Sequence, residues 1–313
     1  MLNRQQFHFR LLIFILFQLA LIRVTDGQSV LTDVTAAFKA ISATPQLLHL
    51  KNGGFKIPAG GHLQGIQSLN NRDIVITASS DSYSYYMVGQ LNQRTGKGKI
   101  TSVQKIADSP YRHAGGCQVN TDTMVVGIED NRARDKSQIV MVSFDDSSKQ
   151  NDSHVIAHRE GFVKRSTAGA VGFTKDNSGH YLVAVGDWDS RNIDFYLSKS
   201  WSILLFDSLT TFSAAIGQKW PSYQSINLLA DANGKIYLIG FALDGVNNRA
   251  DLFEVSLQKE AAYLRLISTR NFKCKGGAGF RYGSGICVTR DKKLAIYTCG
   301  RNVTGHTPIN IFR

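Results

Sequence analysis

A six-residue motif occurs five times along this 313-residue chain and constrains its fold more than any other feature. The two clearest copies are HLQGIQ, which begins at His62, and HAGGCQ, which begins at His113. Three more degenerate copies begin at Ser166, Ser222 and Tyr282, so successive copies are separated by 51, 53, 56 and 60 residues. A nearly regular period of this length predicts a fold built from one repeated unit.

A similar order of turns and strands follows each copy. In the fourth copy the turn sequence DANG at 231–234 leads into the β-rich segment KIYLIGFA at 235–242, and a second β-rich segment comes after a polar loop. The first four copies have one more such segment before the next motif, which the fifth copy lacks. Each unit is therefore predicted to form about four antiparallel strands. We expect residues 46–53 (QLLHLKNG) to supply the strand missing from the fifth unit.

This pattern predicts an all-β fold, a five-bladed β-propeller of four-stranded antiparallel blades that is closed by the N-terminal strand at 46–53. Closing the ring protects the sheet edges that an open array would expose. The spacing of Val34, Phe38 and Ile41 predicts a short helix within 33–42. No linker divides residues 28–313, so we expect a single domain there.

Two positions of the motif have predicted structural roles. The glycines at its fourth position should allow close packing of strands at the crowded axis; they are Gly65, Gly116, Gly169 and Gly285. The glutamines at its sixth position, Gln67 and Gln118, are predicted to form hydrogen bonds between adjacent blades.

Three stretches carry a resemblance to known proteins: the motif copy HAGGCQ, VGDWDSRNIDFYLS at 185–198 and YLIGFALDGVNNRADLFEVSL at 237–257. Over residues 60–313 the chain resembles five-bladed propellers and a group of secreted propeller proteins without an assigned activity. The resemblance implies the propeller fold and no particular reaction, since fold does not determine function. The last three motif copies lack the histidine, so a ring of equivalent histidine sites is not implied.

The first 27 residues have the pattern of a secretory signal peptide. Arg4 and Arg10 precede an apolar run at 11–22, and Thr25 and Gly27 could occupy the cleavage site. An uncleaved membrane anchor is the alternative, but the run is shorter than the ~20 residues needed to span a bilayer. We therefore expect a secreted or periplasmic protein with no membrane span once the signal peptide is removed.

Secretion has two further consequences for the predictions. Cys117, Cys274, Cys287 and Cys299 could form disulfides, and a bridge among the last three would link parts of the C-terminal region; the pairing stays open. Asn151 and Asn302 lie in glycosylation acceptor patterns, which matter only in a eukaryotic source.

The chain carries a formal net charge of +12. This balance favours an anionic small molecule or a glycan as partner, although a basic, solvated surface would give the same composition. No Lys/Arg-rich block or nucleic-acid motif is present, so we expect no nucleic-acid partner. We expect a monomer, and the sequence assigns no cofactor.

In a propeller, the motif starts and the loops after each second strand would meet at one face, where a ligand pocket is expected. The predicted ligand-binding residues are His62, Arg112, His113, Glu129, Arg165, Asp187, Arg281 and Tyr282. Arg112, Arg165 and Arg281 each directly precede a motif, so they could converge on a carboxylate or phosphate. The alternative is that each arginine forms an ion pair that links blades.

A metal site is a weaker alternative at the same face. His62 and His113 with Glu129 and Asp187 would be suitable ligands for a transition metal, and DWDSRN at 187–192 offers oxygen ligands for calcium. Because these residues lack the spacing of a known metal motif, structural roles are favoured and we assign no metal.

The favoured hypothesis is a secreted binding module with a polar, partly basic central pocket for an acidic or hydroxyl-rich ligand, such as a glycan or phosphorylated compound. A hydrolase or lyase is the second hypothesis, with Glu129 or Asp187 as base and arginine or a metal stabilising negative charge. A scaffold for protein–protein interactions is the third.

Overall fold

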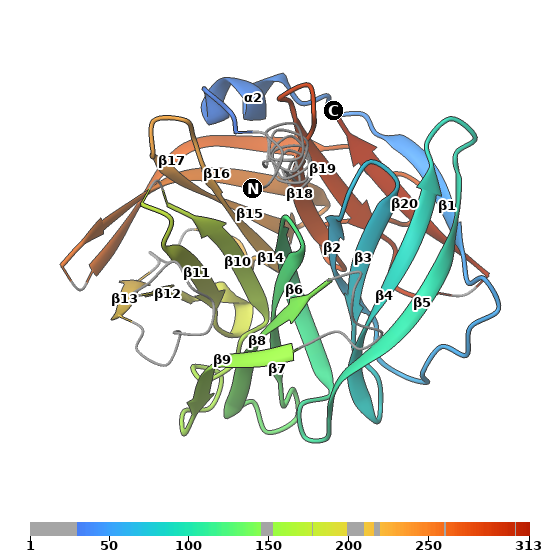
Figure 1. Ribbon diagram of the computed structural model, residues 1–313, viewed down its shortest axis with the longest axis horizontal. Coiled ribbons are helices and arrows are strands. Elements are labelled where there is room, and N and C mark those ends of the chain that lie inside the picture. The colour runs from blue at the N-terminus through green and yellow to red at the C-terminus, as the bar shows by residue number, and fades with distance from the viewer. Residues whose placement is uncertain are drawn as a thin grey trace, which may run out of the picture.

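The computed structural model describes residues 30–144, 153–176, 178–198, 210–215, 220–259, 261–303 and 305–313. The predicted signal peptide and Asn151 lie outside these residues. The described chain forms the expected five-bladed β-propeller of antiparallel blades. Figure 1 shows the inner strands β2, β6, β10, β14 and β18 nearest the centre.

The blades follow one another along the chain. Blade 1 contains β2 (Leu63–Ser68), β3 (Asp73–Ala78), β4 (Tyr83–Asn92) and β5 (Lys97–Asp108). Blade 2 contains β6 (His113–Asn120), β7 (Thr123–Glu129), β8 (Lys136–Ser143) and β9 (Ser153–Glu160). Blade 3 contains β10 (Ala170–Lys175), β11 (Tyr181–Gly186), β12 (Asn192–Leu197) and β13 (Thr210–Ala215). Blade 4 contains β14 (Ser225–Ala230), β15 (Ile236–Asp244), β16 (Asn247–Gln258) and β17 (Ala261–Phe272).

Blade 5 joins the two ends of the described chain. It contains β18 (Ser284–Val288), β19 (Leu294–Cys299), β20 (His306–Phe312) and, as its outer strand, β1 (Gln46–Lys51). The register of β1 on β20 is antiparallel and continuous, from Gln46 opposite Ile311 to Lys51 opposite His306. The prediction that 46–53 completes the fifth blade is therefore confirmed.

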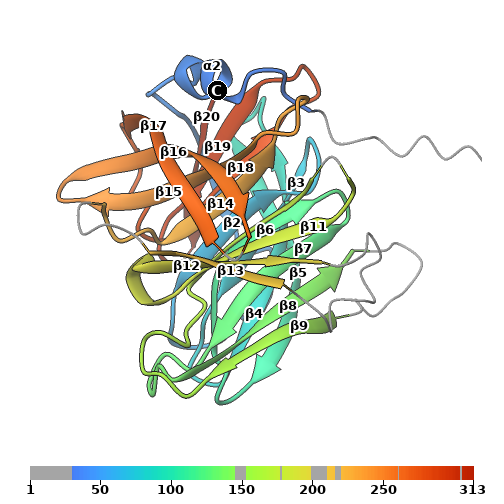
Figure 2. The same cartoon turned by 90° about the vertical axis from the view of Figure 1, so that its left-hand side faces the viewer.

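The predicted short helix is α2 (Val34–Ala40), which lies at the top of Figures 1 and 2. The Asp33 side chain accepts a hydrogen bond from Ala36 N at 2.8 Å and caps its first turn. Val34 and Phe38 are fully buried and pack in one apolar cluster with Phe272 of blade 4 and Phe312 of blade 5. The helix thus seals the joint between these two blades.

Each of the two clearest motif copies contains a β-bulge. In β2 the register on β3 shifts between Leu63 and Ile66, and in β6 the register on β7 shifts between Ala114 and Cys117. A bulge turns neighbouring side chains away from the regular pleat. Thr77 Oγ1 accepts from Gly65 N at 2.8 Å and donates to Gly115 O at 2.7 Å, which ties the two bulges together.

Motif glycines allow the inner strands to approach one another closely. A Cβ on Gly65 would lie 2.7 Å from Cys117 N, and one on Gly285 would lie 2.0 Å from Ile66 O. Gly169 differs, because the nearest atoms to its Cβ position are the Glu129 carboxylate oxygens at 3.9 Å. The predicted packing role therefore holds at Gly65 and Gly285 but not at Gly169.

Three side-chain amides fill the centre of the ring, and we call Gln67, Gln118 and Asn227 the amide hub. Gln118 Oε1 accepts from Phe173 N and from Leu228 N, both at 2.7 Å, and its Nε2 donates to Leu228 O at 2.6 Å. Gln67 Nε2 donates to Cys117 O at 3.1 Å and to Asn227 Oδ1 at 3.3 Å. These bonds reach blade 4 as well as adjacent blades, so they extend further across the ring than predicted.

All four cysteines are free thiols, so the expectation of a disulfide is wrong for this structure. Cys117 and Cys274 belong to separate apolar clusters, apart from Cys287 and Cys299. Cys287 lies opposite Ala295, four residues before Cys299 on β19. Four residues of strand span roughly 13 Å, which is too far for a disulfide.

In the described residues, no helix is long and apolar enough to cross a membrane.

Alanine substitutions at two equivalent motif glycines should reduce the stability of the fold by very different amounts. Gly285→Ala would place a Cβ within 2.1 Å of both Ile66 O and Gln67 Nε2, so we expect a loss of about 3 kcal/mol or more in the free energy of unfolding. Gly169→Ala is the matched control and should change stability by less than ~1 kcal/mol, because its Cβ has ordinary contacts. Urea denaturation of both variants tests this; equal losses would contradict close packing at Gly285.

Candidate functional site

A polar pocket of about 430 Å³ lies at one end of the propeller axis. All five blades contribute to it, through the starts of the inner strands and the loops that follow the second strands. Its walls include six of the eight predicted ligand residues: His62, His113, Glu129, Asp187, Arg281 and Tyr282. We call this the axial pocket. The role of these residues in binding stays a prediction.

One buried amide connects the two motif histidines. Gln64 Nε2 lies 2.5 Å from His62 Nε2 and 2.8 Å from His113 Nε2. With the amide nitrogen as donor, each imidazole accepts through Nε2. The two rings lie 5.6 Å apart between centroids. Neither Nε2 lone pair is therefore free to take a proton from a ligand while Gln64 stays in place.

Glu129 lies against the second histidine, although His113 Nδ1 has no well-aligned hydrogen bond among the described residues. Its Oε1 lies 3.0 Å from His113 Nδ1, and its Oε2 accepts a hydrogen bond from Ala168 N at 2.8 Å. Both oxygens are thus engaged by neighbouring groups, and the side chain is almost fully buried. A paired, hydrogen-bonded carboxylate of this kind orients an imidazole more readily than it acts as a free base.

His62 is the most strongly perturbed histidine of the pocket. Burial, followed by the nearby His113, Arg301 and Arg281, lowers the pKa of His62 from 6.5 to about 4. Its main-chain N–H donates to Ser79 Oγ at 3.0 Å, and the same hydroxyl lies 3.4 Å from Nδ1. The imidazole is therefore neutral at pH 7 and adds no positive charge to the pocket.

Asp187 is the carboxylate with a raised pKa, which is caused chiefly by burial and opposed by hydrogen bonds from Asn192. Asn192 N donates to Oδ1 at 2.9 Å and Asn192 Nδ2 donates to Oδ2 at 2.7 Å. These bonds form a local turn, as expected when an aspartate caps its own loop. A buried carboxyl with a raised pKa in a cleft is also a candidate proton donor.

The positive charge of the pocket comes from Arg281 and Arg301 of blade 5. In the described chain the arginine ion pairs involve Arg159, Arg165, Arg249 and Arg265, and neither pocket arginine forms one. Arg281 lies 6.0 Å from the ring centre of Tyr282. Both guanidinium groups are exposed and can engage an anion.

The other two predicted arginines lie outside the axial pocket. Arg165 makes a two-pronged ion pair with Asp194, with Nη1–Oδ2 at 2.5 Å and Nη2–Oδ1 at 2.6 Å. Arg112 donates from Nη1 to Asp81 O at 2.9 Å and lines a neighbouring hollow. The structure therefore does not bring the three arginines together, because Arg165 is held in an ion pair by Asp194 of blade 3.

The four side chains considered for a metal are also engaged with other groups. Both histidine Nε2 atoms contact Gln64, Glu129 contacts His113, and Asp187 binds Asn192. Over the part of the chain that the structure describes, no three His, Cys, Asp or Glu side chains group as metal ligands. In DWDSRN, Trp188–Ser190 forms a single turn of 3-10 helix, and the Arg134 guanidinium stacks 4.1 Å from the Trp188 ring.

The predicted ligand-binding residues did not include Gln64, Gln224 or Arg301, which also line the axial pocket. A signal was present: both glutamines occupy the third position of their motif copies. The histidines drew attention to the first position, while the bulge that turns Gln64 toward them is not readable from one sequence.

A larger hollow of about 810 Å³ lies at the opposite end, where Gln118 forms part of its wall. Its charged groups include Lys293, which pairs with Asp291 at 3.0 Å, and Arg313, which bonds to Gln93. No histidine and no unpartnered cluster of buried groups lines it. We favour the smaller axial pocket because two histidines, two buried carboxylates and two arginines without ion pairs converge there.

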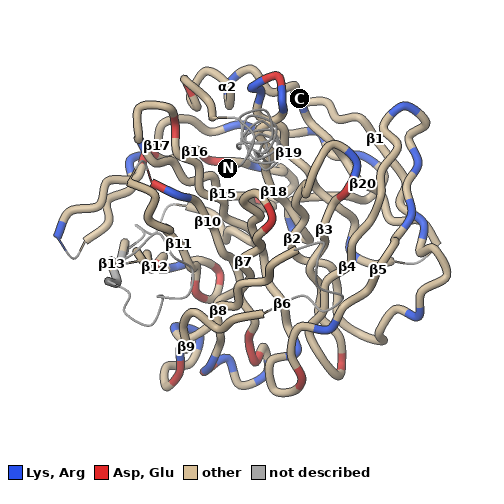
Figure 3. The backbone as a smooth tube through the Cα atoms, in the orientation of Figure 1, with Lys and Arg blue, Asp and Glu red and all other residues tan. Residues whose placement is uncertain are grey.

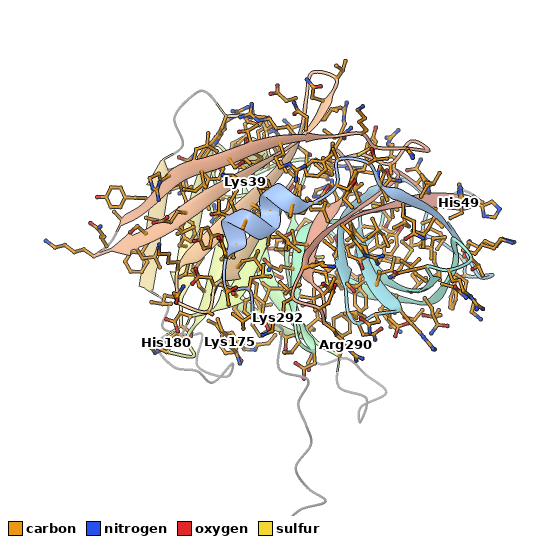
Figure 4. All side chains as sticks on the ribbon, turned by 90° about the horizontal axis from the view of Figure 1, so that it is seen from above. Lys39, His49, Lys175, His180, Arg290 and Lys292 are labelled. Atoms are coloured by element: carbon orange, nitrogen blue, oxygen red, sulfur yellow. The ribbon has the colours of Figure 1, made fainter. Side chains whose placement is uncertain are left out.

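The positive charge of the chain is spread rather than concentrated. Figure 3 shows Lys and Arg on loops and strands around the whole molecule. The labelled residues in Figure 4 illustrate this, since Lys39 lies apart from Lys175, Arg290 and Lys292. Non-specific attraction to polyanions therefore has no single basic face to act through.

No model of a known protein family and no curated protein sequence matches this chain. Among solved structures it is similar to an exo-β-1,3-galactanase from Clostridium thermocellum, at 13% identity and a TM-score of 0.48, over 83% of this chain and 60% of that one. It is also similar to an exo-β-1,3-galactanase from Phanerochaete chrysosporium with β-1,3-galactotriose, at 10% identity and a TM-score of 0.49, over 85% of this chain and 63% of that one. A third similar structure is a GH43 β-xylosidase/α-arabinofuranosidase from a compost microbial metagenome, at 11% identity and a TM-score of 0.47, over 83% of this chain and 94% of that one.

The chain spans 60% and 63% of the two galactanase structures. Its structural neighbours are thus distant five-bladed propellers, and the likeness concerns the fold alone. Any function has to be argued from the pocket itself.

The depressed pKa of His62 predicts a specific loss of stability in acid. Because the folded-state pKa of about 4 lies below the ordinary 6.5, the unfolded chain binds more protons between these values. The part of the folding stability that depends on a neutral His62 is fully present above pH 6.5 and is lost as the pH falls through 4. Urea denaturation between pH 7 and pH 4 should therefore show a steeper fall for the wild type than for His62→Gln.

The exposed His49→Gln variant is the matched control and should keep the wild-type pH dependence. Parallel pH profiles for the wild type and His62→Gln would show that His62 is not desolvated in the folded state.

Proposed function

We propose that this protein is a secreted or periplasmic binding protein that holds a small acidic, hydroxyl-rich ligand in the axial pocket. The observation that carries this proposal is the pair of exposed arginines, Arg281 and Arg301, next to a buried network of neutral polar groups. The N-terminal signal-peptide pattern supports export from the cytoplasm.

The charges of the pocket are arranged in two halves. Arg281 and Arg301 lie on blade 5, whereas Glu129 lies on blade 2 and Asp187 and Asp189 lie on blade 3. In a ring of five blades, blades 2 and 3 are the two that lie opposite blade 5. An anionic group would therefore bind the arginines, while hydroxyl groups of the same molecule could donate to carboxylate and amide oxygens across the pocket.

The state of the imidazoles favours binding over proton transfer. Gln64 occupies Nε2 of both rings, and Glu129 and Ser79 lie beside the Nδ1 atoms. Such a network fixes the shape of the pocket before a ligand arrives, which lowers the entropy lost on binding. A sugar acid or a sugar phosphate combines the anion and hydroxyl groups that this pocket suits.

Removing the arginines should weaken binding of an acidic sugar. Each charge-assisted contact is worth about 1.5–3 kcal/mol, so Arg281→Gln and Arg301→Gln should each lower affinity about tenfold or more. Calorimetry with galacturonate and glucose 6-phosphate measures this and separates a carboxylate from a phosphate ligand. Inorganic phosphate and neutral galactose are the control ligands.

Arg94→Gln, at an exposed loop position outside the axial pocket, is the matched control variant and should keep the wild-type affinity. An unchanged affinity in both pocket variants, or equal binding of galactose and galacturonate, would contradict an anion site at Arg281 and Arg301.

Hydrolysis or elimination on the same face is the second candidate, and the raised pKa of Asp187 favours it. A carboxyl that stays protonated to higher pH can act as a general acid. If this candidate holds, Asp187→Asn should abolish cleavage of a nitrophenyl glycoside while galacturonate still raises the melting temperature. Absence of turnover in the wild type over a panel of such glycosides leaves binding as the function.

A further inference from the structure

Two smaller hollows share His62 with the axial pocket. One, of about 280 Å³, lies on the blade 5 side and includes Arg301; the other, of about 230 Å³, lies on the blade 2 side and includes Arg112 and Arg132. His62 lines all three. His62 directly precedes β2 of blade 1, and we call the three hollows together the His62 groove.

Two arginine pairs flank this groove at equivalent positions of the repeat. Arg112 and Arg281 each directly precede a motif copy, while Arg132 and Arg301 each lie in the loop after a second strand. One pair therefore belongs to blade 2 and the other to blade 5, with blade 1 between them. The two pairs line different hollows, one on the blade 5 side of His62 and one on the blade 2 side.

The blade 2 pair carries unneutralised positive charge, like the blade 5 pair. Neither Arg112 nor Arg132 forms an ion pair with a carboxylate in the described chain, although Asp81 lines the same hollow. Arg112 binds only the Asp81 carbonyl oxygen through Nη1, and its buried Nε has no hydrogen-bond partner among the described residues. A bound anion would supply the missing acceptor.

We propose that the ligand of the His62 groove is an acidic oligosaccharide, with one anionic group at the blade 5 arginines and another at the blade 2 arginines. This inference rests on the proposed function, since the blade 5 pair is the anion site of the axial pocket. A ligand that contacts both pairs has to extend through the hollows on both sides of His62. A chain of sugar acids repeats its anionic groups and can contact both.

The lining of the groove suits sugar rings better than a peptide or a simple polyanion. Beside Arg301 the wall is apolar, with Ile57, Pro58 and Val303, and offers contact to the C–H faces of a sugar. On the other side the Asn131 side-chain amide offers hydrogen bonds to hydroxyl groups. A peptide would more commonly add to an exposed strand edge, whereas this groove is formed by strand starts and loops.

Chain length is the variable that tests this proposal. Calorimetry at low salt with galacturonate and its di-, tri- and tetramer should show affinity rising about tenfold or more from monomer to tetramer, since each added charge-assisted contact is worth at least a factor of ten. The gain should disappear in Arg112→Gln/Arg132→Gln. Arg132→Gln alone, at an exposed position, should reduce it and guards against misfolding of the double variant.

Arg72→Gln, in the turn between β2 and β3, is the matched control and should retain the full gain. A monomer that binds without any gain in the tetramer would overturn the groove proposal and leave the proposed function standing. Binding of no acidic sugar at all would overturn both. An equal gain with tripolyphosphate, with neutral galactose oligomers or with glutamate oligopeptides would also overturn the assignment to an acidic oligosaccharide.

Discussion

The amide hub at the centre of the ring is the interaction on which the rest of the propeller depends. A ring of blades leaves an axial channel lined by strand backbone, whose buried N–H and C=O groups need partners. Gln118 gives partners to Phe173 N, Leu228 N and Leu228 O, and Asn227 Nδ2 adds a bond to Cys117 O at 3.3 Å. Long amide side chains can span this gap because each carries a donor and an acceptor.

The hub also explains the sixth position of the repeated motif. Amide side chains occupy it in copies 1, 2 and 4, as Gln67, Gln118 and Asn227, while Val171 and Cys287 occupy it in the other two. Only three amides are placed at a centre that each of five blades approaches. The repeat therefore diverges for a steric reason: identical side chains from every blade could not fit together on the axis.

The same divergence produces an asymmetric pocket above the hub. The first position places His62 and His113 next to each other, and the bulges of β2 and β6 turn Gln64 between them. Blade 5 carries Tyr282 at this position and contributes Arg281 beside it. One ring thus holds two imidazoles on one side and unneutralised arginines on another, which a symmetric set of sites could not provide.

The sequence predicted the features that depend on local pattern. Hydrophobic alternation and turn residues located the strands, and the missing fourth strand of the last unit located its partner at 46–53. The common face followed from the order of strands within each unit. What could not be predicted were contacts between blades, such as Gln118 with Leu228, which are 110 residues apart. Such contacts depend on the closure of the ring, and no local pattern encodes them.

The three arginines that precede motif copies show this limit most clearly, because identical positions have different outcomes. Arg165 meets the buried Asp194, which also binds the buried Arg159 of blade 2 at 2.7 Å, so Asp194 links blades 2 and 3. Arg281 has no such carboxylate within reach in the described chain and stays exposed at the pocket. Burying an arginine is tolerated only with a paired acid. One aspartate on β12 therefore separates an arginine that supports the fold from one that is free to bind a ligand.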